Sequence, residues 1–336
     1  MRLKEFQEYL HSCRIDFAVF FDKDANLVYF SDARPDSACL VIPSSGKPLL
    51  FVPGFEAERI SEGSAVDVVK VNNDLFETVR SHFSGRRIGI VSGAVSYSRA
   101  SALKSKFSAE LISVEDKCKE LRMTKTRAEA GRIIKACAIT DSLFDELCDN
   151  FSSFKTELDA ASFLKFRMSQ LGFEPSFPPI IASGINGATP HHVPDNSKLS
   201  GFTVIDFGII YKNYCSDITR TVFVGVPSEK DKKAYQDLLK VQKQCIELVV
   251  PGTTLEEIDK FAHGKVKHMV HRVGHSLGVE VHDAQTRPFR LEFGSVLTIE
   301  PGTYTKFGIR IEDDVILVKA PVVLTRSSKE LRVIRR

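Results

Sequence analysis

The most constraining feature of the chain is a pair of β-rich runs that flank Lys212-Asn213 within residues 201–225. Because Asn tolerates the positive φ of a tight turn, this pattern predicts a β-hairpin that pairs Gly208 with Asp217. Side chains alternate between faces, so Asp206 would lie diagonal to Asp217, roughly 7 Å or less apart at Cβ. A slip of one residue would put the carboxylates on opposite faces. The competing interpretation is a solvent-exposed polar face.

A second pair of carboxylates lies near the C-terminus. Glu300 closes an apolar strand that ends at Pro301-Gly302, and Glu312 lies in the middle of the next strand. Glutamate is depleted in strand interiors and is seldom buried without a partner, so this pair requires compensating positive charge. Arg310 shares a face with Glu312 by strand alternation and would compensate one carboxylate in a purely structural arrangement.

Three histidines lie between the two carboxylate pairs, namely His271, His275 and His282, in a glycine-punctuated segment. Each alone is more often a core or surface residue than a ligand, but the combination favours a metal site. Converging carboxylates without metal would force one another to protonate, whereas two divalent cations balance four negative charges. Oxygen ligands with one imidazole suit Mn²⁺, Co²⁺, Fe²⁺ or Zn²⁺. Two such ions activate water and polarise a carbonyl, so hydrolysis is the expected reaction.

The length of 336 residues and the order of the patterns predict two domains. The first ~115 residues alternate helical patterns with short apolar runs, which is typical of an α/β domain. These runs cover residues 17–21, 38–42, 49–52 and 87–91. Residues 116–150 predict two successive helices with a break at 124–127. We place the boundary near residue 122, giving domains 1–122 and 123–336, and seven of the nine histidines follow it.

Composition and charge argue against several kinds of partner. The formal charge is +3 and no stretch interleaves basic with aromatic residues, so we expect no nucleic-acid partner. No window holds the ~18 uninterrupted apolar residues of a membrane span, so we expect no membrane partner. Seven scattered cysteines without a CxxC pair favour the reducing cytoplasm.

Six motifs resemble those of the pita-bread metallopeptidases, which comprise prolidases, aminopeptidase P, creatinase and methionine aminopeptidases. They occur in the family's order, and the resemblance covers nearly the whole chain. They are SGINGATPHHV (183–193), VIDFG (204–208), SDITRT (216–221), GHSLGVEVHD (274–283), IEPGTY (299–304) and GIRIEDD (308–314).

The resemblance implies two divalent metal ions per subunit, with Mn²⁺ or Co²⁺ foremost and Zn²⁺ or Fe²⁺ as alternatives. Asp206 would bind one ion, Asp217 and Glu312 would bridge both, and His275 and Glu300 would complete the other shell. All five positions carry the residue type that the family uses.

The resemblance also implies roles around the substrate. His191 would contact the substrate near the scissile bond, His282 would stabilise the tetrahedral intermediate, and Glu300 would also move the proton. His271 and Arg310 match residues that support substrate binding in the proline-specific branches.

The implied fold is α+β, with an N-terminal α/β creatinase-like domain followed by a pita-bread domain built on a curved antiparallel sheet. The expected activity is hydrolysis of the Xaa-Pro bond of dipeptides by a cytoplasmic homodimer that acts on short proline-containing peptides. One alternative is aminopeptidase P, which accepts longer Xaa-Pro peptides. The other is an inactive pita-bread binding protein, whose metal content would distinguish it.

Overall fold

A computed structural model describes residues 2–22 and 24–335, and the chain divides into two compact units between Leu121 and Arg122. The first unit is a mixed six-stranded sheet with the order β4-β3-β2-β1-β5-β6. Its strands are β1 (Phe17–Phe21), β2 (Cys39–Pro43), β3 (Leu49–Pro53), β4 (Asp67–Val71), β5 (Arg87–Ile90) and β6 (Glu110–Ser113). Its helices are α1 (Arg2–Ser12), α2 (Ala25–Ser31), α3 (Ala57–Ser61), α4 (Leu75–His82) and α5 (Tyr97–Phe107).

Both faces of this sheet are buried under helices. Ala18 and Phe20 of β1 pack in one apolar cluster with Phe6 of α1, while Phe17 and Val19 pack in another with helices α4 and α5. The four predicted apolar runs became the four central strands. The edge strands β4 and β6 consist of exposed and half-buried residues, and the apolar pattern did not predict them.

Two helices connect the units in sequence, as expected. Helix α6 (Glu115–Met123) is followed by α7 (Arg127–Asn150), so the predicted break is confirmed. Thr126 caps α7 and forms a reciprocal capping box with Glu129, which supplies backbone partners at the start of the helix.

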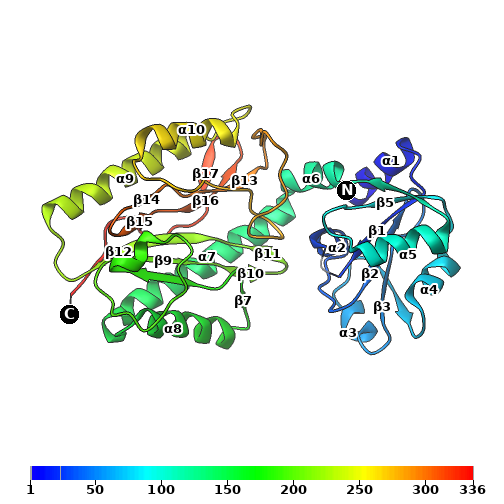
Figure 1. The fold of residues 1–336 in the computed structure, drawn as a ribbon, viewed down its shortest axis with the longest axis horizontal. Coiled ribbons are helices and arrows are strands. Elements are labelled where there is room, and N and C mark those ends of the chain that lie inside the picture. Colours follow the sequence, from blue (N-terminus) through cyan, green and yellow to red (C-terminus); the bar gives the residue numbers. More distant parts are fainter. Residues whose placement is uncertain (1, 23, 336) are drawn as a thin grey trace. The chain divides into compact units, whose positions relative to one another are not determined.

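The second unit is built mainly from antiparallel strands. Figure 1 shows them between α7 and α8 on one side and α9 and α10 on the other. The remaining helices are α8 (Glu157–Gln170), α9 (Glu229–Glu247) and α10 (Leu255–Lys265), with short 3-10 turns at Phe151–Ser153 and Gly184–Ala188. The strands are β7 (Glu174–Pro175), β8 (Ile180–Ser183), β9 (Gly201–Phe207), β10 (Ile209–Tyr211), β11 (Tyr214–Cys215), β12 (Ile218–Val224), β13 (Val296–Ile299), β14 (Gly302–Tyr304), β15 (Gly308–Arg310), β16 (Asp313–Leu317), β17 (Pro321–Val323) and β18 (Val333–Ile334).

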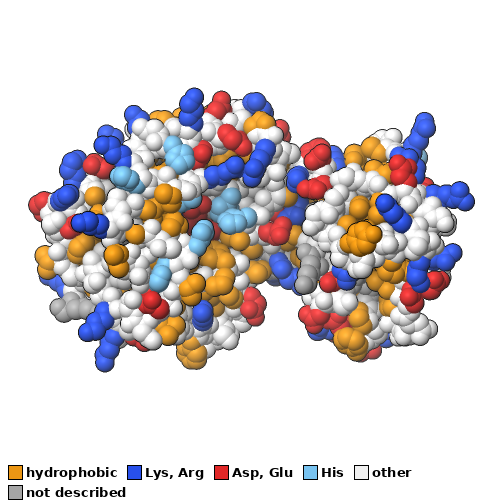
Figure 2. All heavy atoms as spheres, viewed as in Figure 1, with side chains coloured by type: hydrophobic (Ala, Val, Ile, Leu, Met, Phe, Trp, Pro, Cys, Tyr) orange, Lys and Arg blue, Asp and Glu red, His pale blue; other side chains and the backbone are white. Residues whose placement is uncertain are grey.

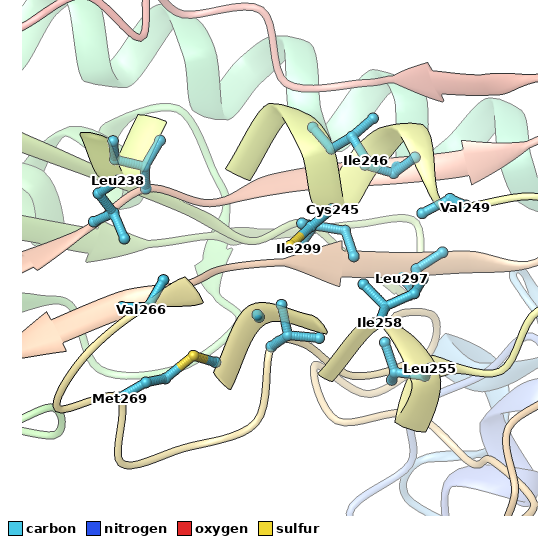
Figure 3. Packing of buried hydrophobic residues seen from close by; sticks show 14 of the residues in the cluster. Leu238, Cys245, Ile246, Val249, Leu255, Ile258, Val266, Met269, Leu297 and Ile299 are labelled. Carbon is cyan, nitrogen blue, oxygen red and sulfur yellow. The ribbon is translucent and has the colours of Figure 1, made fainter. Parts of the chain in front are cut away.

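Each half of this unit buries its strands against its own pair of helices. One apolar cluster joins α7 and α8 to β8, β9 and β12. The other joins α9 and α10 to β13 and β16, and Figure 3 shows Ile258 beside Leu297 in it. The α+β class predicted from the sequence is confirmed. Within the described residues, no helix is both long and apolar enough to cross a membrane.

The first predicted hairpin has the predicted register. Lys212 and Asn213 adopt positive φ values of 45° and 69°, and Tyr211 pairs with Tyr214 beside them. Further along, Asp206 pairs with Thr219 in the same register, which is the one that places Gly208 opposite Asp217. A Cβ at Gly208 would lie 1.8 Å from the carbonyl oxygen of Ser216, so the close strand approach requires glycine there.

The second pair differs in one respect from the prediction. Glu300 follows the last residue of β13, but Glu312 lies between β15 and β16 instead of inside one strand. The Glu312 backbone N–H donates to the carbonyl of Thr219 (3.0 Å), so it joins the two hairpins. Glu312 therefore bonds to a different hairpin from its neighbours Ile311 and Asp313.

Candidate active site

One cavity of about 440 Å³ in the second unit collects every side chain that the sequence singled out. Figure 2 shows histidine side chains gathered on one face of this unit. The predicted residues that line the cavity are His191, Asp206, Asp217, His271, His275, His282, Glu300, Arg310 and Glu312. They come from segments up to 121 residues apart in sequence, which the two hairpins, the loop before β13 and the loop before β9 bring together.

Three of the carboxylates are buried and incompletely satisfied. Asp206, Asp217 and Glu312 are 7%, 4% and 2% exposed. Among the described residues, no hydrogen-bond donor reaches Asp206 Oδ1, Asp217 Oδ1 or Glu312 Oε1. Buried polar atoms nearly always have a partner, so three open carboxylate oxygens in one cavity fit a bound cation.

His275 presents a ring nitrogen to this cluster. Its Nδ1 lies 3.1 Å from the carbonyl oxygen of Ser276, so Nδ1 carries the proton and donates. Nε2 therefore holds the lone pair, and it lies 3.7 Å from Asp217 Oδ2 and 3.5 Å from Glu300 Oε1. Burial and the neighbouring His282 lower the pKa of His275 to about 3, which keeps the ring neutral, as a metal ligand must be. Ligand atoms of Asp217, His275 and Glu312 all lie within 4.8 Å of one another.

Each of these buried carboxylates makes it harder for its neighbours to lose their protons. Burial, followed by the charge of Glu312, raises the pKa of both Asp217 and Glu300 well above their ordinary values. Burial and Asp206 raise the pKa of Glu312 to about 8. The cluster is therefore stable as a set of anions only when positive charge is added to it.

Without divalent ions, the folded protein is expected to lose stability as the pH rises from about 6.5 to about 8. In this window the unfolded chain has released the Glu312 proton while the folded chain keeps it, so the free energy of unfolding falls with pH. Each such group contributes a slope of up to about 1.4 kcal/mol per pH unit. Below about pH 6.5 the buried neutral His271 and His275 have the opposite effect, because the unfolded chain takes up protons there that the folded chain does not. Thermal melts of chelator-treated protein between about pH 6.5 and about pH 8 test the sign. Stability that rises with pH would contradict the arrangement of buried carboxylates.

Arg310 neutralises a different carboxylate from the one expected. Its guanidinium pairs with Asp206, and its Nε donates to Thr219 Oγ1 at 3.0 Å. Thr219 Oγ1 in turn donates to Glu312 Oε2 at 2.7 Å. Arg310 therefore pairs directly with Asp206 and reaches Glu312 only through a threonine hydroxyl, while its positive charge counteracts the rise in the pKa of both glutamates.

Tyr304 links two cavity residues and was not singled out from the sequence. Arg310 Nη1 donates to the Tyr304 hydroxyl at 3.1 Å, and that hydroxyl lies 2.7 Å from His271 Nε2. His271 Nδ1 donates to the carbonyl of Arg272, so Nε2 accepts from Tyr304. Burial lowers the pKa of His271 to about 4, consistent with this neutral form. Tyr304 ends the motif IEPGTY, which was the available signal.

Asp314 supports the cluster from behind and was also missed. Its Oδ2 accepts from the backbone N–H of Asp217 at 2.9 Å and from the Cys137 thiol at 3.2 Å. The side chain is fully buried. Its place directly after Glu312-Asp313 in GIRIEDD was the only sequence signal.

Glu157, at the start of α8, anchors the loop that carries His191. Its carboxylate is fully buried and accepts from the Ser183 N–H at 2.7 Å and from Asn186 Nδ2 at 3.1 Å. Its other oxygen lies 2.6 Å from His192 Nε2. His192 therefore points to this anchor, and of the two adjacent histidines only His191 lines the cavity.

Glu157→Ala is expected to destabilise the protein by about 3–5 kcal/mol, because several buried donors lose their acceptor. Glu229→Ala is a matched control. Glu229 is also the first residue of a helix with a capping box, but its side chain is 89% exposed. That change should cost about 0.5 kcal/mol or less. Thermal unfolding of both variants checks the prediction, and equal shifts would refute it.

Comparison with known proteins identifies both parts of the chain. Residues 131–319 match the sequence profile of metallopeptidase family M24, and residues 2–124 match that of the creatinase/prolidase N-terminal domain. The Xaa-Pro dipeptidase of Pyrococcus furiosus is 34% identical, over 98% of this chain and 99% of that protein. The crystal structure of the prolidase from Pyrococcus horikoshii gives a TM-score of 0.90 at 32% identity, covering 98% and 99%. X-Pro aminopeptidase from Thermotoga maritima gives 0.87 at 29%, covering 96% and 98%.

Proposed function

The chain belongs to metallopeptidase family M24 and carries the creatinase/prolidase N-terminal domain, and from this premise we propose that it hydrolyses the Xaa-Pro bond of dipeptides. The relatives named as Xaa-Pro dipeptidases match over nearly the whole of both chains. The observation that carries the proposal is the group of three buried carboxylate oxygens without donors, beside the unprotonated nitrogen of His275.

The donor set fits two divalent ions. Asp206, Asp217, His275, Glu300 and Glu312 would hold them, with Asp217 and Glu312 shared between the two. Oxygen donors with a single imidazole suit Mn²⁺ or Co²⁺, with Zn²⁺ and Fe²⁺ as alternatives. When bound, such ions lower the pKa of water toward neutrality and polarise the carbonyl group.

The protein side chains then supply proton transfer and orientation. Three carboxylates contact His275 or Arg310, and the side chain of Glu300 is the most exposed of them: 16% of its side-chain surface is accessible, against 10% for the side chain of Asp206 and 6% for that of Asp217. It is therefore the one placed to take a proton from water and deliver it to the proline nitrogen. His282 donates a hydrogen bond to the oxygen that becomes negative during attack, and His191 contacts the substrate beside the scissile bond. His271 and Arg310, joined through Tyr304, form the supporting wall.

Several finer points belong to the same proposal. The catalytic domain would comprise residues 123–336 and the creatinase-like domain residues 1–122. All seven cysteines are free thiols, six of them buried, which supports a cytoplasmic location. We propose a homodimer by analogy with the family, and sedimentation equilibrium tests it.

The test is turnover of Gly-Pro, Leu-Pro and a tripeptide Xaa-Pro-Yaa by chelator-stripped protein that is re-titrated with Mn²⁺, Co²⁺ or Zn²⁺. Metal-restored cleavage of the dipeptides alone establishes the dipeptidase. Cleavage of the tripeptide favours an Xaa-Pro aminopeptidase, the second candidate, which the similarity to the Thermotoga maritima enzyme supports. No turnover, together with fewer than one ion bound per chain, would leave an inactive binding protein.

A further inference from the structure

Two buried cations converge on one buried carboxylate directly after the cavity residue His282. Asp283 Oδ1 accepts from Arg122 Nε at 3.0 Å, and Asp283 Oδ2 accepts from Lys125 Nζ at 3.2 Å. The side chains of Arg122, Lys125 and Asp283 are only 4%, 3% and 2% exposed. This ion triad lies beneath the loop that carries His275 and His282.

The loop is built around the Asp283 carboxylate. The Asp283 N–H donates to the Ser276 carbonyl at 2.8 Å and closes residues 276–283 into a compact turn. A Cβ at Gly278 would lie 1.9 Å from Asp283 Oδ2, so the loop backbone wraps tightly over the carboxylate. The Gly278 carbonyl also accepts from the Cys215 N–H at 2.8 Å, which ties the loop to the hairpin that bears Asp217.

The charges of the triad favour the arrangement in which the Asp283 carboxylate lies between Arg122 and Lys125. Burial acts to raise the pKa of Asp283, but Arg122 and Lys125 outweigh burial and hold that pKa below its ordinary value. A buried ion pair of this kind adds little net stability compared with apolar side chains, yet breaking it leaves uncompensated buried charge. The triad therefore acts mainly to hold the loop in a single conformation.

We infer that Arg122 and Lys125 are positioning residues for the reaction, which act through Asp283 to hold the His282 imidazole over the cavity. The inference rests on the role of His282 in the proposed function. The His282 side chain is exposed on the cavity wall, and its ring meets the His275 ring edge-on at a centroid distance of 4.2 Å. Asp283 is the next residue in the chain, so anchoring its side chain holds the backbone from which this exposed ring projects.

The test begins with Asp283→Asn, which keeps the size of the side chain but removes the charge that both cations require. Because a misplacement of 1 Å is sufficient to cost about 100-fold, we expect kcat on Gly-Pro to fall about 10- to 100-fold. KM and the number of metal ions per chain should change less than about twofold, because four of the five proposed metal-binding residues, all except His275, come from outside this loop.

A double-mutant cycle with His282→Ala separates positioning from general structural support. If Asp283 acts through His282, Asp283→Asn should lower kcat by less than about twofold in the His282→Ala background. An equal loss in both backgrounds would overturn the inference. A His282→Ala protein with unchanged kcat would instead refute the proposed role of His282, and the two failures are therefore distinct.

Two further variants supply an answer if Asp283→Asn does not fold and a matched control. Arg122→Lys keeps the cation but loses the two-pronged contact with Asp283, so it should show a smaller kcat loss of the same kind and the same dependence on His282. It decides the question if Asp283→Asn does not fold. Glu280→Gln is the matched control, because it removes a half-exposed partner of the same Arg122, 2.7 Å away, and should leave kcat within about twofold.

Discussion

Glu300→Gln is expected to keep the fold and to lower kcat about 1,000-fold. Glutamine has the size of glutamate but neither takes up nor releases a proton near neutral pH. Glu300 has one oxygen 3.5 Å from His275 Nε2 and the other 3.9 Å from His271 Nδ1, and it is partly open to the cavity. Steady-state turnover of an Xaa-Pro dipeptide, measured with the metal content of the same sample, checks the prediction.

The control for this experiment is Glu292→Gln. Glu292 is exposed and lies just before β13, the strand after which Glu300 follows, so this change should leave kcat unaltered. Near-normal turnover in a fully metallated Glu300→Gln protein would show that another group moves the proton. Low activity that accompanies loss of metal would show that Glu300 acts only as a metal ligand.

Asp217→Asn is expected to abolish binding of at least one metal ion and to reduce activity by more than about 100-fold. Changes to residues outside the ligand shell alone typically cost 10- to 100-fold in affinity, and loss of a shared ligand should exceed that. Asp217 Oδ1 has no donor among the described residues, so the amide nitrogen of Asn would occupy a position suited to a cation.

The same variant, Asp217→Asn, should stabilise the metal-free protein. Burial and the nearby carboxylates raise the pKa of Asp217 well above its ordinary value, so a neutral amide relieves repulsion there. We expect a higher Tm than for metal-free wild type and a smaller rise in Tm on addition of Mn²⁺. Asp237→Asn, which affects an exposed ion pair on α9, is the control and should change neither quantity. A lower Tm of the metal-free variant, together with normal metal binding, would show that Asp217 is not a metal ligand.

Local sequence was sufficient to predict the first hairpin in detail. Lys212-Asn213 supplied a turn that requires positive φ, and period-two alternation then placed Asp206 and Asp217 on one face. These are short-range steric properties, so a single sequence contains them. The second hairpin was predicted less well, because Glu312 leaves the strand to bond with Thr219, about ninety residues earlier in the chain.

The supporting residues around the cavity were not predictable in the same way. Tyr304, Asp314 and Asp283 each end a recognisable motif, but the motif does not say what the side chain contacts, and Glu157 lies in no motif at all. Each becomes significant through partners that are far away in sequence, such as Asp283 with Arg122. A polar side chain acquires its role only when folding buries it and determines which donors reach it.

The sequence by itself therefore determined the two-part α+β organisation, the hairpin register and nine of the side chains that line one cavity. These depend on hydrophobic periodicity, turn chemistry and recognisable motifs, all of which act over a few residues. Only the tertiary structure decided that Arg310 pairs with Asp206, which carboxylate oxygens remain open, and what anchors His191 and His282. Those outcomes depend on burial and on distances of a few ångströms between remote segments, and one-dimensional patterns do not contain them.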